Sequence, residues 1–323
     1  MSTRDLCLCL TPLHALIAGQ ISRKLGKGFD VGMYVTNVDN AKHRHYAEKM
    51  RAYCTCVEYI VTPSEDSYAK PRHLSILLRR LNYRLRWAKL GTFSAVYVPS
   101  SLNHYTYILL SSIGLARIST YDDGMLNIQS DSQLLSARTS LSAKIFLRMA
   151  GVRFWAEKLM ERSAQHFTIY AAKNVFARTV QIGLFDDSAD FSAADGKDFR
   201  LLVGAAPEAS PAVWSELQSF VEEAAPDVYL PHPREVEPKL KGVAYLETPL
   251  IAEDYISGKL VADPALKIKI FGYESSILVN LAGVPRVESF SLMPDNKDCS
   301  EARSLMKRCG VSLVHGQGLS TEL

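Results

Sequence analysis

Two short segments, far apart in the chain, carry residue types that could do chemistry. Residues 121–124 read Tyr-Asp-Asp-Gly, and residues 230–235 read Leu-Pro-His-Pro-Arg-Glu. Each follows an apolar run that is typical of a buried strand. Because ligands in open α/β sheets bind at the carboxyl ends of strands, both segments fall where a site is expected. The pair predicts a carboxylate base and an imidazole partner for a phosphate or leaving group, facing each other across a cleft.

The acidic segment offers two neighbouring carboxylates on a glycine turn. Asp122 and Asp123 are adjacent at a strand end, so their side chains diverge and at most one is expected to face a ligand. Gly124 permits a positive φ, which lets the chain turn sharply and leaves room for a ligand. A carboxylate facing an acceptor hydroxyl can act as a general base. An ordinary aspartate turn is the alternative, and two carboxylates without nearby histidines are weak grounds for a metal.

The second segment holds an imidazole between two prolines. Pro231 and Pro233 fix φ on either side of His232 and limit how far the loop can move. A rigid imidazole can donate a hydrogen bond or a proton to a phosphate oxygen. A surface histidine in a proline turn is the alternative.

A third segment, residues 270–276, runs from a strand through a loop into a helix. Ser275 is expected to be the N-cap, with Ser276 beside it, and a helix N-terminus suits a phosphate because its N–H groups are free. Glu274 could accept hydrogen bonds from a ribose diol. We group Gly272 and Pro233 with these residues on the donor side. Simple capping, which needs only one serine, is the alternative.

Composition sets limits on the class of protein. The 323 residues favour two domains, and 47% apolar with 22% charged residues is typical of a soluble globular protein. A net charge of +3 is too small to argue for nucleic acid. No apolar stretch reaches the roughly 20 residues of a membrane span. There is no secretory signal pattern, and the six cysteines are expected to be free, so we expect a cytoplasmic protein.

Residues 70–89 form a basic segment with leucines at helical spacing. One interpretation is a solvated helix packed by its leucine face. The other is a basic amphipathic helix on an anionic membrane surface, which would make the protein peripheral at the inner face of the cell membrane. Both stay open, as does a homodimer.

Alternating strand and helix patterns predict two parallel-sheet domains, residues 1–185 and 198–323, joined by an apolar-poor linker at 186–197. Strands are expected at 5–10, 31–36, 56–61, 93–98, 118–121, 167–170, 201–203, 228–230, 243–246, 268–272 and 286–289. Helices are expected at 13–25, 41–54, 70–89, 105–113, 135–154, 155–163, 211–223, 252–256, 275–281 and 301–307. A cleft between two such domains is a common ligand site.

The three segments together resemble the bacterial sialyltransferases. Several of those families share an acidic-acidic-glycine motif, a His-Pro motif and a serine-pair motif, which stand here at 122–124, 232–233 and 275–276 in that order. The opening Cys-Leu-Thr-Pro-Leu at 9–13 also resembles the start of glycosyltransferase family 52, which contains lipooligosaccharide sialyltransferases. The polysialyltransferase family is the next most similar.

This resemblance implies a GT-B fold, with two Rossmann-like domains, and CMP-sialic acid as the donor. It implies that Asp123 is the general base, that His232 faces the CMP phosphate and that the serine pair binds it, with no metal or cofactor. Thr11, Pro12 and Gly124 are assigned to the acceptor side. Glu208, at a strand end that opens the second domain, is a rival base that the sequence does not rank against Asp123.

The resemblance therefore predicts an inverting transferase acting on a bacterial surface glycan, lipooligosaccharide or capsule. A transferase of the same fold that uses another nucleotide sugar, such as a UDP-hexose, is one alternative. A nucleotide-sugar-binding protein without turnover is the other.

Overall fold

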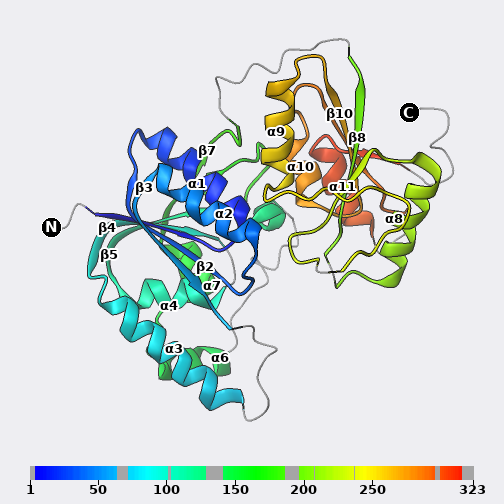
Figure 1. Cartoon of the computed structure of the whole chain (residues 1–323). Helices are drawn as coiled ribbons and strands as arrows, with labels where there is room; N and C mark the ends of the chain where they lie inside the picture. The colour runs from blue at the N-terminus through cyan, green and yellow to red at the C-terminus, as the bar shows by residue number, and fades with distance from the viewer. Residues whose placement is uncertain are drawn as a thin grey trace. The chain divides into compact units, whose positions relative to one another are not determined.

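The chain divides into two compact units, Met1–Leu184 and Phe185–Leu323, each built on a parallel sheet (Figure 1). The computed structural model describes residues 4–63, 72–100, 103–128, 141–185, 196–206, 208–235, 237–294 and 299–314. No helix in these ranges combines the length and the apolar character needed to cross a membrane.

The first unit holds a seven-stranded sheet among its described residues, in the order β3-β2-β1-β4-β5-β6-β7. Every neighbouring pair is parallel. The bounds are β1 Asp5–Cys9, β2 Phe29–Thr36, β3 Cys54–Val61, β4 Thr92–Pro99, β5 Gly114–Tyr121, β6 Ser163–Thr168 and β7 Thr179–Gln181. The strand order reverses between β1 and β4, and the crevice at such a reversal is where open α/β sheets bind ligands.

Helices alternate with these strands: α1 Pro12–Leu25, α2 Ala41–Lys49, α3 Arg72–Ala88, α4 His104–Ser112, α6 Leu141–Met149 and α7 Ala156–Arg162, with 3-10 turns η1 Met50–Ala52 and η3 Gly124–Asn127. All five residues of β1 are buried, as expected for a strand covered on both faces. Leu6 and Leu8 pack with Val96 and Val98 of β4 in the core of this unit.

The start of α1 shows how a local signal positions a functional side chain. Thr11 caps the helix, its Oγ1 accepting a hydrogen bond from His14 N at 3.3 Å, and Pro12 takes the first helical position. Gly26 ends the helix at φ 63°. Because only two residues separate the end of β1 from the start of α1, His14 lies at the carboxyl end of β1.

The second unit holds a five-stranded parallel sheet among its described residues, in the order β12-β11-β10-β8-β9. The strands are β8 Asp198–Val203, β9 Val228–Leu230, β10 Lys267–Gly272, β11 Val287–Ser291 and β12 Ser312–Leu313. The helices are α8 Pro211–Ala224, α9 Ala252–Ala262, α10 Ser276–Leu281 and α11 Ser300–Arg308. Here the strand order reverses between β10 and β8. Because the strands are parallel, β8, β9 and β10 have their carboxyl ends at one edge of the sheet.

Several predicted elements were wrong in detail. The helix expected at 41–54 ends at Lys49, because Met50–Ala52 tighten into a 3-10 turn and β3 begins at Cys54. The strand expected at 167–170 is β6, which begins at Ser163 and ends at Thr168. The strand expected at 243–246 is a single bridge between Tyr245 and Tyr229.

The helix expected at 135–154 is α6 within the described residues and ends before Gly151, whose φ is 69°. Residues 129–140, and most of the expected linker at 186–197, lie outside the described ranges, as does Lys70 of the basic segment. The strands β7 and β12 were not predicted, because they have too few residues to show an alternation of apolar and polar side chains in the sequence.

Candidate active site

The carboxyl edge of the first sheet brings together two side chains that lie 109 positions apart in sequence. Nε2 of His14, on the first turn of α1, lies 2.8 Å from Oδ1 of Asp123, the residue that precedes η3. His14 is 1% exposed, whereas the side chain of Asp123 is 25% exposed. Of the two, Asp123 is therefore the group that a ligand can reach.

The hydrogen bonds around His14 decide which of its ring nitrogens carries the proton. The backbone N–H of Leu10 donates to Nδ1 at 3.1 Å, so Nδ1 is an acceptor and the ring is neutral. The proton then lies on Nε2, which donates to the Asp123 carboxylate. The ring also packs edge-on against Tyr121, with centroids 5.7 Å apart. His14 is thus a fixed donor that orients Asp123.

Gly124 provides the turn that separates the two aspartates. Its φ of 62° starts η3 directly after Asp123. Asp123 stays at the surface of this edge, while Asp122 is fully buried. Divergence of the neighbouring carboxylates was expected, and the structure assigns the exposed position to Asp123.

Asp122 is held inside the protein by three donors. Its Oδ1 accepts from Asn127 Nδ2 at 2.9 Å and from His166 Nε2 at 2.9 Å, and its Oδ2 accepts from the backbone N–H of Ile169 at 2.7 Å. Asn127 Oδ1 in turn accepts from Ser100 Oγ at 2.9 Å. This network connects the ends of β4, β5 and β6, so Asp122 supports the turn that presents Asp123.

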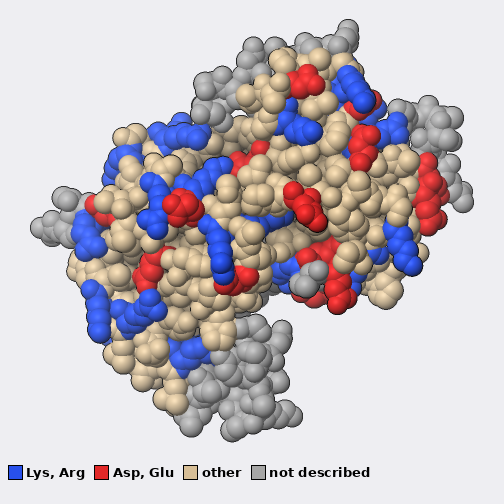
Figure 2. All heavy atoms as spheres, viewed as in Figure 1, with Lys and Arg blue, Asp and Glu red and all other residues tan. Residues whose placement is uncertain are grey.

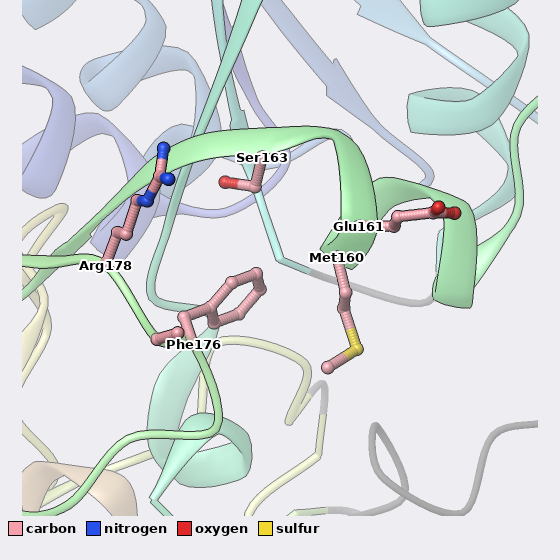
Figure 3. Close-up of a pocket in the computed structure, with 6 residues that line it drawn as sticks. Met160, Glu161, Ser163, Phe176 and Arg178 are labelled. Atoms are coloured by element: carbon pink, nitrogen blue, oxygen red, sulfur yellow. The ribbon is translucent and has the colours of Figure 1, made fainter.

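His166 is stacked on Phe176, with ring centroids 4.1 Å apart. Phe176 also lines a cavity of about 320 Å³ near the amino end of β6, together with Met160, Ser163 and Arg178. Figure 3 shows these side chains around the cavity and Glu161 directed away from it. None of the residues proposed from sequence lines this cavity, which lies toward the opposite end of β6 from Asp122 and Asp123.

In the second unit, His232 lies in a tight turn directly after β9. The backbone N–H of Arg234 donates to Nδ1 of His232 at 3.1 Å, so the proton of the neutral ring is on Nε2. The N–H of Glu235 bonds His232 O at 2.8 Å and closes the turn. Tyr229 Oη donates to Glu235 Oε2 at 2.6 Å, which ties the turn back to its strand. Pro233 is half-buried within this turn.

Gly204, at the end of β8, makes room for this turn. A Cβ there would lie 2.8 Å from the backbone nitrogen of His232 and 2.5 Å from Tyr229 Oη. Gly272, at the end of β10, has a comparable packing role, since a Cβ would lie 2.7 Å from Val203. The two glycines allow the carboxyl ends of β8, β9 and β10 to pack closely.

Glu208 has a partner of its own. Arg234 Nη1 donates to Glu208 Oε1 at 2.5 Å, and both side chains are well exposed. The pKa of Glu208 is lowered, mainly by a hydrogen bond from its own backbone N–H and to a smaller extent by the positive charge of Arg234. A carboxylate that holds its proton less tightly is a weaker general base.

The serine pair lies at the start of α10, after β10. Ser275 is the N-cap, its Oγ accepting from Ile277 N at 3.4 Å, and Ser276 is the first helical residue. Both serines are half-buried and Glu274 is exposed. Within the described residues there is no group of three or more His, Cys, Asp or Glu side chains with the spacing of a metal site.

The family model of glycosyltransferase family 52 matches residues 31–296 of this chain. This chain belongs to glycosyltransferase family 52. It is therefore a glycosyltransferase, and the family expected from the three motifs is confirmed.

Two characterised relatives match most of the chain. A CMP-N-acetylneuraminate:beta-galactoside alpha-2,3-sialyltransferase of Pasteurella multocida is 28% identical, over 96% of this chain and 98% of the relative. An N-acetyllactosaminide alpha-2,3-sialyltransferase of Haemophilus influenzae is 27% identical, over 88% of this chain and 90% of the relative.

Solved structures confirm the GT-B fold of this family 52 chain. The calicheamicin glycosyltransferase CalG4 has a TM-score of 0.50 at 13% identity, over 99% of this chain and 87% of that one. The kitacinnamycin glycosyltransferase has a TM-score of 0.50 at 11% identity, over 99% of this chain and 88% of that one.

Three residues of this arrangement were missed from sequence. His14, Asn127 and His166 are buried and hydrogen-bonded around the two aspartates. His14 follows the helix cap by three residues, a position that could have pointed to the strand edge. For Asn127 and His166 we find no signal in sequence, because their partners come from different strands.

Proposed function

We propose that this enzyme is an inverting sialyltransferase, which transfers sialic acid from CMP-sialic acid to a hydroxyl of a bacterial surface glycan, lipooligosaccharide or capsule. Two full-length relatives with sialyltransferase names support the donor. One structural observation carries the chemical part of the proposal: a surface-reachable carboxylate, Asp123, is oriented by a buried neutral histidine at the carboxyl edge of a Rossmann-like sheet.

Asp123 is the proposed general base. Its Oδ1 is held by His14 Nε2, and no described residue is hydrogen-bonded to its Oδ2. An acceptor hydroxyl can donate to that oxygen and transfer its proton there as its own oxygen attacks the anomeric carbon. Thr11 and Pro12 fix the start of α1 and Gly124 fixes the turn, so these three residues act on the acceptor side by positioning the base.

His232 is the proposed partner of the leaving group. As the bond between the anomeric carbon and the phosphate oxygen breaks, negative charge builds on departing CMP, which takes the electron pair. The Nε2 proton of a neutral His232 can stabilise that charge by donating to a phosphate oxygen. We assign Ser275, Ser276 and the N–H groups at the start of α10 to the same phosphate, and Glu274 to the ribose diol.

Asp122 and Glu208 fit the role of base less well than Asp123. All three donors to Asp122 come from the protein interior. Glu208 is paired with Arg234, and its pKa is lowered. We therefore assign Asp122 a supporting role and leave Glu208 outside the reaction.

We also propose that no metal or cofactor takes part, because the phosphate has protein donors in His232 and the serine pair. The proposed location is the cytoplasm at the inner face of the cell membrane, with peripheral association through the basic helix α3.

A donor screen tests this function. CMP-sialic acid, UDP-galactose and UDP-glucose are incubated with the enzyme and a β-galactoside acceptor such as lactose, with Asp123→Asn as the inactive control. We expect a sialylated product from CMP-sialic acid alone. Transfer only from a UDP-hexose would overturn the donor assignment, and binding of CMP-sialic acid without any turnover would overturn the enzymatic role.

A further inference from the structure

α3 leaves an apolar face in solvent on the side away from the core. Leu78, Leu81 and Leu85 are 37–59% exposed. At about 100° per residue, these three positions fall on one stripe of the helix. Trp87 lies on the opposite side of α3 and is fully buried in the core. α3 is therefore docked by one face and presents leucines on the other.

α6 repeats the same arrangement. Leu141, Ile145 and Met149 are 51–73% exposed and recur every four residues, which places them on one stripe. Leu147, on the other side of the helix, and Ala150, directly after its end, are buried in the same core cluster as Trp87.

The two helices are neighbours. The guanidinium of Arg84, on α3, lies against Gly151, which follows the end of α6. Figure 1 draws α6 alongside α3. We call the surface formed by the exposed leucines of α3 and the exposed stripe of α6 the α3–α6 face.

Cations lie beside this face. Neither α3 nor α6 contains Asp or Glu, while Arg79 and Arg86 of α3 and Arg148 of α6 lie next to the exposed stripes. Arg86 is also paired with Glu58 of β3. Figure 2 shows Lys and Arg side chains over the region where Figure 1 places α3, with apolar or neutral surface between them. Exposed leucines flanked by arginines are the pattern of a helix that lies in a membrane interface.

Trp155 adds an aromatic group to the α6 side. Its half-buried ring is contacted by three cations, Lys144, Arg148 and Lys158, at 5.2–5.6 Å from the ring centroid. Lys144 is also paired with Glu157 at 3.1 Å. A ring of this kind, with cations around it, suits the headgroup level of a bilayer.

We propose that the α3–α6 face binds the surface of a bilayer that contains anionic phospholipids. The exposed aliphatic side chains enter the boundary between headgroups and acyl chains, and the arginines contact the lipid phosphates. This deepens the location proposed above and does not depend on the donor sugar. It would hold the acceptor-side unit, which contains Asp123, at the surface where lipid-linked glycans are presented.

Vesicle flotation tests the proposal. The full-length enzyme is mixed with vesicles of phosphatidylcholine alone or with about a third phosphatidylglycerol, without sugar donor. The test variant is Leu85→Ser/Met149→Ser. The matched control is Val261→Ser, which changes a 60% exposed apolar residue on α9 of the other unit.

We expect the wild type to float only with the anionic vesicles, and less at high salt. The double variant should partition on the order of tenfold more weakly, with unchanged thermal stability and unchanged turnover of a soluble acceptor. The control should float like the wild type.

Equal flotation of wild type and double variant would overturn the proposal, as would no flotation of the wild type. A concentration-dependent dimer that the double variant abolishes, without vesicle binding, would assign the face to a second copy of the chain instead. Because flotation needs no turnover, failure here leaves the proposed transferase activity standing.

Discussion

His14 is predicted to matter for turnover although it lies beneath the surface that a ligand contacts. His14→Ala removes the N–H that orients Asp123 at 2.8 Å. A hydrogen bond to a charged group is worth about 1.5–3 kcal/mol. At about 1.4 kcal/mol for each factor of ten, the loss corresponds to a roughly 10- to 100-fold fall in kcat.

We expect no larger loss of kcat in His14→Ala, because the backbone around Asp123 keeps its other stabilising interactions. Gly124 still turns the chain, and Asp122 still holds its three donors. The variant also leaves Leu10 N without its acceptor, which should lower the free energy of unfolding by about 1–3 kcal/mol. Kinetics are therefore measured well below the melting temperature.

The informative comparison is His14→Gln, whose side-chain amide can still donate to Asp123. The assay is steady-state transfer from CMP-sialic acid to lactose, with the donor varied. We expect kcat to fall in His14→Ala and to recover in part in His14→Gln. The donor KM should change little in both variants, because the proposed donor residues belong to the second unit. If His14→Ala turned over like the wild type, or if Gln were no better than Ala, His14 would be only a packing residue.

Three further predictions concern the second unit, the metal and the pH. His232→Ala should lower kcat roughly 100-fold or more with little change in thermal stability or donor binding, in steady-state kinetics and melting curves; a wild-type kcat would remove it from the reaction. Activity should be complete in excess chelator, and a strict need for magnesium or manganese would contradict the proposed protein donors. Burial lowers the pKa of His43 to about 4, so the unfolded chain binds this proton at higher pH than the folded one. The free energy of unfolding, measured with urea, should therefore fall by about 2 kcal/mol between pH 7 and pH 5 from this group. The variant His43→Gln should no longer show this fall in the free energy of unfolding between pH 7 and pH 5, whereas the control His45→Gln should still show it.

Much of the fold could be predicted from sequence because the signals are local. Residues 6–9 of the buried strand β1 form an uninterrupted apolar run, and Thr11-Pro12 marks the start of α1 by cap and φ preference. The end of α2 could not be predicted, since Met50–Ala52 keep a helix-like composition and tighten into a 3-10 turn only as the chain enters β3.

The site could be predicted only in part, because its arrangement depends on contacts between residues that are far apart in sequence. The strand-end position of Asp122 and Asp123 was visible, but which of them faces outward depends on donors from residues 127, 166 and 169. The partner of Asp123 lies 109 positions away, and only the order of strands in the sheet brings it close. Glu208 stayed a rival because nothing in sequence pairs it with Arg234, 26 positions on.

The rate of sialic acid transfer in Asp123→Asn, beside Asp122→Asn, tests the central claim most directly. Asp123→Asn should fold and melt like the wild type and keep its affinity for CMP, since the side chain is partly exposed, but should lose at least about 100-fold in transfer to lactose. Asp122→Asn should instead melt at a lower temperature, because it disturbs a buried network. Transfer at a near wild-type rate by a folded Asp123→Asn enzyme would contradict the assignment of Asp123 as the base.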